Sequence, residues 1–479
     1  MRPAITQTNR RWWVLATMTG ALSMLMLDTT VVSVALPTIE HDLGVSQTGV
    51  QWIVNGYLLA LAALVAVGGR LADLLGAERT FRIGATVFIA ASAACGVAPS
   101  QAVLVAARAV QGAGAALMAP ATSAILMNTF GPSERGRAMG IFSGVSMIFL
   151  ALGPLIGGTL TDVVSWRAVF YVNLPVGLVM LALARVTLPR RAAGWSVAGM
   201  DWPGTAMLVG SLCALVLALM QGASWGWESR DVVGLFAVAA ALLAPFVWWE
   251  RRCSHPVVDL SLLGEGSFAM IGAVLASVQF ALSGVTIFGA IWVQSVLGYE
   301  PITAGLSLLP LTLSLLVCAP LAGRLYDRIG ARVPLTAGSL LVAAGLASLA
   351  SVLPDQRYEL IVPGYVAIGI GLALTISPGS TDAIATASPP RRGAASGLVQ
   401  TLRQVGGTVG IAVLGAIITH VLTKSGASRA AVQSAAVADA YWVAVGLMLL
   451  AAIGAAVLIG PRARAAATPA PAAAAETRA

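Results

Sequence analysis

Long apolar stretches alternate with short polar ones along almost the whole chain. A helix that crosses a membrane needs about 20 mostly apolar residues. Stretches of that length predict fourteen membrane spans joined by short connections. The expected spans are 12–35, 50–69, 80–98, 101–127, 137–160, 168–188, 203–221, 231–249, 267–297, 302–323, 333–352, 360–380, 394–420 and 440–460. An even number of spans places both termini on the same side of the membrane.

The composition agrees with a multi-pass membrane protein. Hydrophobic residues make up 58% of the chain and charged residues 10%, against about 45–50% and about 25% in soluble domains. Most Arg and Lys residues fall on the side of the membrane that holds the N-terminus, so the positive-inside rule predicts that both termini are cytoplasmic. The same asymmetry explains the net charge of +8 without a nucleic-acid partner.

One short charged segment occurs twice. Gly69-Arg70-Leu71-Ala72-Asp73-Leu74-Leu75-Gly76 and Gly323-Arg324-Leu325-Tyr326-Asp327-Arg328-Ile329-Gly330 keep Gly, Arg, Leu, Asp and Gly in register. Arg135-Gly136 with Gly140 recurs in the same way as Arg392-Gly393 with Gly397. The chain is therefore a duplication. Glycine permits close backbone approach, and the aspartate can cap a helix or pair with an arginine. The alternative interpretation of each charged segment is a tight helical hairpin at the membrane surface with no special role.

Three charges are expected inside the membrane, where an ionisable group is costly unless it is paired or hydrated. Asp28 and Arg108 reach a similar depth in their spans, so we expect them to meet. Gln111 shares a helix face with Arg108. Two alternatives remain, namely a carboxylate satisfied by hydroxyl groups and an arginine that only neutralises Asp28. Arg403 lies near the bilayer centre, either as a donor to backbone carbonyls or as a substrate contact.

The span 137–160 contains Gly153-Pro154-Leu155-Ile156-Gly157-Gly158. Proline removes a helical hydrogen bond, and glycine lets a neighbouring helix approach closely. This pattern predicts a helix that bends and packs tightly.

Taken in order, the segments 28–37, 69–76, 108–116 and 153–158 resemble signature motifs of the major facilitator superfamily. Fourteen spans, with an extra pair between the two halves, resemble its drug:proton antiporter branch of bacterial multidrug and antibiotic efflux proteins. The segment that includes Asn173-Leu174-Pro175-Val176-Gly177 is also similar to that branch. The resemblance covers roughly residues 10–460 and departs from the pattern at Ala77-Glu78, where the family usually has basic residues.

The resemblance implies an all-α membrane protein with two six-helix bundles and two extra helices. The expected division is a cytoplasmic tail 1–11, an N-terminal bundle 12–188, a linker 189–252 with the extra helices, a C-terminal bundle 253–461 and a disordered tail 462–479.

The resemblance also assigns roles to individual residues. Asp28 and Arg108 are expected to couple transport to protons. The expected gating-loop residues are Gly69, Arg70, Asp73, Gly76, Arg79, Gly323, Arg324, Asp327 and Arg328. The antiporter element comprises Gly153, Pro154, Gly157 and Gly158. A cavity of apolar and amide groups is expected to include Asn55, Tyr57, Gln111, Gln279, Phe280, Gln400 and Arg403.

These expectations amount to a monomeric antiporter that exports amphipathic drugs or antibiotics by alternating access. It would use the proton gradient, without a metal or other cofactor. One acidic residue deep in the spans favours a monovalent, neutral or zwitterionic substrate over a dication. The alternative on the same fold is a proton-coupled importer of a small metabolite, which Gly153-Pro154 disfavours because that element accompanies antiporters in the family. An enzyme or receptor is disfavoured because no connection is long enough for a catalytic domain.

Overall fold

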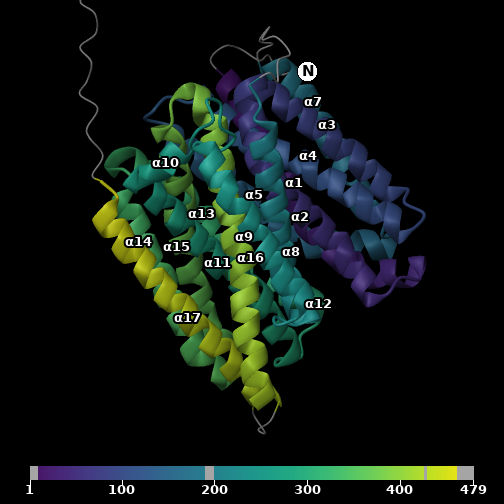
Figure 1. Cartoon of the computed structure of the whole chain (residues 1–479). Helices are drawn as coiled ribbons and strands as arrows, with labels where there is room; N and C mark the ends of the chain where they lie inside the picture. The colour runs from purple at the N-terminus through teal and green to yellow at the C-terminus, as the bar shows by residue number, and fades with distance from the viewer. Residues whose placement is uncertain (1–8, 189–198, 425–428, 461–479) are drawn as a thin grey trace, which may run out of the picture.

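The computed structural model describes residues 9–188, 199–424 and 429–460, which are helical almost throughout (Figure 1). The first half contains α1 (Arg10–Leu43), α2 (Gln47–Leu75), α3 (Ala77–Gly96), α4 (Gln101–Thr129), α5 (Arg135–Val163), α6 (Ala168–Tyr171) and α7 (Asn173–Thr187). It is followed by α8 (Trp202–Trp225) and α9 (Arg230–Glu250). The second half contains α10 (Leu260–Gly264), α11 (Gly266–Ser295), α12 (Pro301–Leu306), α13 (Leu309–Ile329), α14 (Arg332–Val352), α15 (Tyr358–Thr386), α16 (Arg392–Lys424) and α17 (Arg429–Leu458).

The helices match the predicted spans. Thirteen helical stretches of the described residues are long and apolar enough to cross a membrane, with α6–α7 and α12–α13 each forming one of them. The remaining predicted span, 80–98, is occupied by α3, whose first two turns carry Glu78, Arg79 and Arg82. These charges leave α3 a shorter apolar stretch than its neighbours have. The predicted disordered tail, 462–479, lies outside the described residues.

The positions at which several helices begin and end can be explained from the local sequence. Ser46, Asp201 and Ser229 cap the starts of α2, α8 and α9 by accepting hydrogen bonds from backbone N–H groups of the first turn. Gly76 and Gly330, the last residues of the two repeated segments, follow α2 and α13 with φ of 88° and 80°. Glycine takes this conformation without steric penalty, which accounts for its place in both copies.

Two helix bundles meet along two seams. In the first bundle α2 and α3 pack on α4, and α1 packs on α5. In the second, α14 packs on α15 and α17, and α11 packs on α16. One seam joins α5 to α13, and the other joins α2 to α16.

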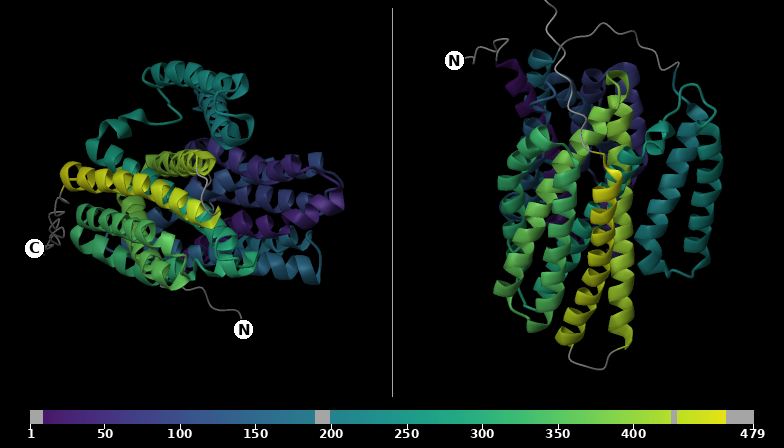
Figure 2. Two further views of the ribbon diagram at one scale, coloured as in Figure 1. Left: turned by 90° about the horizontal axis from the view of Figure 1, so that it is seen from below. Right: turned by 90° about the vertical axis from the view of Figure 1, so that its left-hand side faces the viewer.

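The two helices between the halves form a hairpin outside both bundles. Figure 2 shows α8 and α9 standing beside the rest of the molecule. Helix α8 packs against α9, α2 and α16, so the hairpin covers one flank of the α2–α16 seam. We define this pair as the linker hairpin. The linker hairpin thus lies outside the two duplicated units.

Candidate functional site

A carboxylate and a guanidinium meet in the interior of the first bundle. Asp28 of α1 and Arg108 of α4 form an ion pair, with 2.6 Å between Arg108 Nη1 and Asp28 Oδ2. The two side chains are 0% and 1% exposed, which confirms the predicted contact. Taking either partner away leaves an unpaired buried charge, at a cost of about 3–5 kcal/mol.

Amide groups complete the surroundings of the carboxylate. Asp28 Oδ1 accepts hydrogen bonds from Gln111 Nε2 at 2.8 Å and from Asn173 Nδ2 at 2.9 Å. Ser92 Oγ of α3 accepts from the same two amides, at 3.3 Å from Gln111 and 3.0 Å from Asn173. Helices α1, α3, α4 and α7 therefore meet at one charged centre.

Protein groups also enclose the side of the Arg108 guanidinium that faces away from Asp28. Its Nε donates to the carbonyl of Ile53 at 3.2 Å, and Nη1 also donates to Gln111 Oε1 at 2.7 Å. The ring of Tyr57 lies 4.2 Å from the guanidinium carbon, at a distance typical of a cation–π contact. Tyr57 and Gln111, both expected to line the substrate cavity, are buried within this centre instead.

The sequence alone does not indicate that Asn173 and Ser92 are partners of Asp28 and its amide donors. Asn173 stood in a recognised segment at the start of α7, but nothing in the chain connected it to a residue 145 positions earlier. Ser92 carries no signal at all, since a single serine in an apolar helix is common.

The antiporter element packs on the helix that carries Asp28. Pro154 of α5 has no N–H group, so the carbonyl of Leu150 one turn earlier loses its helical partner. Thr30 Oγ1 of α1 donates to that carbonyl at 2.9 Å. A Cβ at Gly153 would overlap Thr30, and one at Gly157 would overlap the backbone of Val31. The glycines and the proline thus let α5 contact α1 within one turn of Asp28.

The remaining members of the element lie nearby. Gly158 is buried, and Pro154 lies beside Gly305 of α12 in the second bundle.

The first repeated segment contacts the opposite bundle. Both carboxylate oxygens of Asp73, near the end of α2, accept hydrogen bonds from backbone N–H groups at the start of α16. The donors are Gly393 and Ala394, each at 2.7 Å. Gly69 packs against the backbone of Gly393 and Gly397, and a side chain at Gly69 would overlap it.

The second repeated segment makes the reciprocal contact. Asp327, near the end of α13, accepts from the N–H groups of Gly136 at 2.9 Å and Arg137 at 3.0 Å, at the start of α5. Gly323 packs against the backbone of Gly136. Each aspartate therefore caps a helix of the other bundle, where the positive end of the helix dipole favours negative charge. We call these two contacts the inter-bundle caps.

The arginines of the repeated segments do not pair with Asp73 in the described part of the chain. Arg70 Nη2 donates instead to the carbonyl of Gly199, just before the linker hairpin, at 3.1 Å. Arg324 and Arg328 are exposed, and Arg79 is half-buried at the start of α3.

The expected cavity residues fall into separate groups. Tyr57 and Gln111 belong to the Asp28 centre. In the second bundle, Arg403 of α16 donates to Gln279 of α11 at 2.9 Å and to Gln400 at 3.3 Å. Phe280 is buried next to Gln279, and Asn55 is half-buried on α2.

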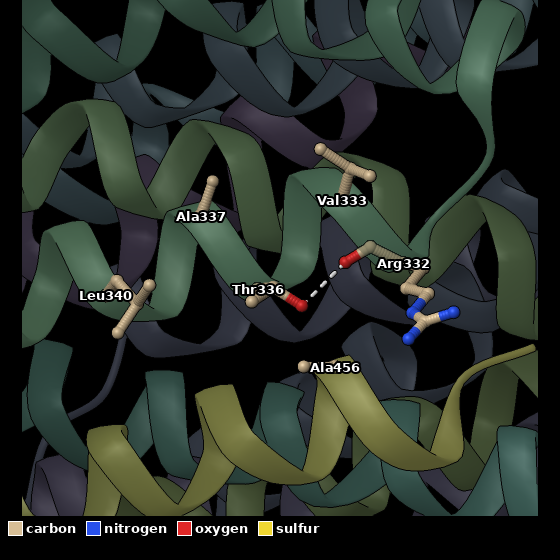
Figure 3. Close-up of a pocket in the computed structure, with 6 residues that line it drawn as sticks. All are labelled: Arg332, Val333, Thr336, Ala337, Leu340 and Ala456. Atoms are coloured by element: carbon tan, nitrogen blue, oxygen red, sulfur yellow. Dashed lines mark hydrogen bonds between the residues drawn. The ribbon is translucent and has the colours of Figure 1, made fainter.

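A surface hollow lies apart from all of these residues. It has a volume of about 280 Å³ and lies between α14 and α17, where Arg332, Val333, Thr336, Ala337, Leu340 and Ala456 line it (Figure 3). Within the described ranges, no group of three or more His, Cys, Asp or Glu side chains is arranged to hold a metal ion.

The family model of the Major Facilitator Superfamily matches residues 18–411. The chain therefore belongs to this superfamily, whose members generally transport small molecules and are not enzymes.

The chain is 38% identical to the puromycin resistance protein pur8 of Streptomyces alboniger, over 95% of this chain and 93% of that protein. It is 37% identical to the multidrug resistance protein Stp of Mycobacterium tuberculosis, over 84% of this chain and 75% of that one. The tetracenomycin C resistance and export protein of Streptomyces glaucescens is 36% identical, over 87% and 77%. The chain is thus a multi-pass membrane protein similar to bacterial transporters.

A solved structure shares the fold. The proton:xylose symporter XylE superposes with a TM-score of 0.68 at 14% sequence identity, over 95% of this chain and 97% of that one.

Proposed function

We propose that this protein is a proton-coupled antiporter that exports amphipathic drugs or antibiotics across the bacterial cytoplasmic membrane. The names of its relatives, which include resistance and export proteins for several antibiotics, support the direction and the kind of cargo. The observation that carries the proton coupling is the sealed Asp28–Arg108 pair, because a carboxylate inside a membrane bundle is the natural carrier of a single proton.

The proton step follows from the hydrogen bonds. Ionised Asp28 accepts from Arg108, Gln111 and Asn173. A proton that arrives from outside removes the charge, weakens the attraction to Arg108 and loosens α1 from α4. Asp28 then releases its proton to the cytoplasm after the bundles have reoriented, and the substrate moves outward in exchange.

Alternating access would depend on the two inter-bundle caps. Asp73 and Asp327 hold the ends of α2 and α13 against the starts of α16 and α5. These contacts would close the cytoplasmic side while the outer side is open, and they would separate in the opposite state. The close packing of Gly153 and Gly157 on α1 would limit leakage along that side of the first bundle.

The proposed orientation of the protein in the membrane rests on the distribution of its basic residues. The end of the molecule that holds the inter-bundle caps also carries a concentration of basic residues, including Arg79, Arg135, Arg328 and Arg391. The positive-inside rule makes this end cytoplasmic, and both termini with it. We propose that the transporter works as a monomer, since each half supplies one cap to the other.

The test uses inside-out membrane vesicles energised with a proton gradient. Export then becomes uptake, which we expect for several fluorescent drugs and neutral antibiotics and which should stop when an uncoupler is added. Accumulation of a metabolite in right-side-out vesicles, with no drug uptake in inside-out ones, would identify an importer instead.

A further inference from the structure

We propose that Arg403, Gln279 and Gln400 form a binding site for the acidic group of an exported substrate. We call these three residues the Arg403 cluster. The proposal rests on the proposed export function and specifies the chemistry of the cargo, namely an amphipathic compound with a carboxylate, sulfonate or similar anionic group.

The first observation is the missing counter-charge. Arg403 lies eleven residues beyond Arg392, where α16 begins, which is about 16 Å along the helix axis. A cation at this depth in a membrane is costly unless it is neutralised. Arg108 is neutralised by Asp28. Arg403 has no acidic partner in the described residues, and its two protein acceptors are neutral amide oxygens.

The second observation concerns the direction of the hydrogen bonds. An arginine only donates, so the amide oxygens of Gln279 and Gln400 must both face the guanidinium. Each amide therefore turns its NH₂ group away from Arg403. Neither NH₂ group has a protein acceptor in the part of the chain that the structure describes. The cluster thus presents a cation and two amide donors, a combination that suits an anion.

The third observation is accessibility. Arg108 is completely enclosed, whereas the side chains of Arg403, Gln279 and Gln400 are all partly accessible. A purely structural arginine would be expected to have its donors satisfied by protein atoms. Arg403 retains a donor without a protein partner among the described residues, since only Nη1 and Nη2 have such partners, and its side chain is partly accessible.

Close packing of α11 against α16 brings the residues of the Arg403 cluster together. Gly406 and Gly410 of α16 lie against the backbone of Ala276 and Phe280 of α11, where a Cβ would overlap it. This close approach brings Gln279 of α11 to the guanidinium of α16. The site is therefore built by the fold and does not depend on one flexible side chain.

The experiment compares two dyes that differ by one acidic group. Anilinonaphthalene sulfonate is an amphipathic anion, and N-phenylnaphthylamine has the same skeleton without the sulfonate. Binding is measured by fluorescence on the purified full-length protein in detergent, without a proton gradient. The variants are Arg403→Gln, Arg403→Lys and Gln400→Glu, and Arg357→Gln is the matched control because it removes an exposed cation elsewhere.

We expect Arg403→Gln to raise the Kd of the sulfonate by about tenfold or more relative to that of the neutral dye, as the loss of a charged hydrogen-bond donor predicts. Arg403→Lys should recover part of the loss. Gln400→Glu should cause the same selective loss, because it places a carboxylate against Arg403. Arg357→Gln should leave the ratio of the two Kd values unchanged.

Three results would overturn the proposal. One is an equal loss for both dyes, which indicates a structural arginine, and another is no loss for the sulfonate. The third is evidence that the site holds a chloride ion only. Chloride would then raise the thermal stability of the natural protein but not that of Arg403→Gln, and the Kd of the sulfonate would be the same for both proteins. Selective binding without gradient-driven export of either dye would instead contradict the exporter and leave the Arg403 cluster standing.

Discussion

At the scale of single residues, Asp28 is held by donors from two other helices, and these donors differ in how directly they act. Asn173 donates to the carboxylate itself, whereas Ser92 accepts from the two amides that do so and donates to the Phe170 carbonyl. Asn173 is therefore a positioning residue of the charged centre, and Ser92 supports it.

This difference predicts an order of effects. Asn173→Ala removes a hydrogen bond to a buried charge, worth about 1.5–3 kcal/mol. Ser92→Ala removes a neutral acceptor and the hydrogen bond that Ser92 donates to the Phe170 carbonyl, each worth about 1 kcal/mol and neither made to the charge itself. We expect gradient-driven export to fall severalfold more in Asn173→Ala, with a shift of its pH dependence that Ser92→Ala does not share. Initial rates measured across a pH series check both points. Equal behaviour of the two variants would contradict the assigned order.

Thr30 supports a second prediction at this scale. Thr30→Val keeps the side-chain shape but leaves the Leu150 carbonyl without its donor, and we expect a loss of about 1–2 kcal/mol in stability. Thermal unfolding in detergent measures it. Thr159→Val is the matched control, because Thr159 is exposed and bonds only within its own helix. A destabilisation as large in Thr159→Val would show that the link between α1 and α5 has no special weight.

The ion pair could be predicted from sequence, but its surroundings could not. Asp28 and Arg108 are costly charges at the same depth, so each requires the other. An amide such as Asn173 is tolerated in many environments, and only the packing of α7 against α1 and α3 brings it to Asp28.

At the scale of helices, the inter-bundle caps explain why the repeated segments carry aspartate. A carboxylate that accepts two N–H groups at a helix start stabilises that contact by about 1–2 kcal/mol. Because the acceptor and the donors belong to different bundles, this free energy favours one arrangement of the bundles over the other.

The caps lead to a third prediction. Asp73→Ala and Asp327→Ala should each shift the protein toward the state with an open cytoplasmic side, by roughly tenfold in population. Distances between spin labels on the ends of α2 and α16 report the shift. Asp201→Ala is the control, since Asp201 caps α8 within the linker hairpin. An unchanged distance distribution in both cap variants would refute the gating role.

The helices themselves were largely predictable, because each must supply a long apolar stretch. Helix α3 marks the limit of that argument, since Glu78, Arg79 and Arg82 reduce its apolar length. The partners of the helices were less accessible to prediction. The repeat showed that α2 corresponds to α13, but it did not show that each one contacts the opposite half.

At the scale of the whole molecule, the duplication becomes a reciprocal assembly. α2 caps α16 while α13 caps α5, so the same contact occurs once at each seam. The linker hairpin breaks this equivalence. It packs along the α2–α16 seam, and Arg70 of the first repeated segment donates to the backbone just before it. No pattern in the sequence indicated on which seam the hairpin would lie.

Proton coupling is a property of the whole molecule, because one carboxylate must sense the gradient while both bundles move. Asp28→Asn removes the titratable group and keeps its shape. It also leaves Arg108 without a counter-charge, so the double variant Asp28→Asn/Arg108→Gln, which removes both charges, serves as a second test that does not bury a lone cation.

The most direct measurement compares uphill and exchange transport in proteoliposomes that contain the purified protein. The natural protein is expected to concentrate a drug against its gradient when a proton gradient is imposed, and also to exchange labelled for unlabelled drug without one. Asp28→Asn and the double variant should lose the uphill accumulation and retain the exchange. Uphill accumulation at the natural rate in either variant would contradict the assignment of Asp28 as the proton carrier.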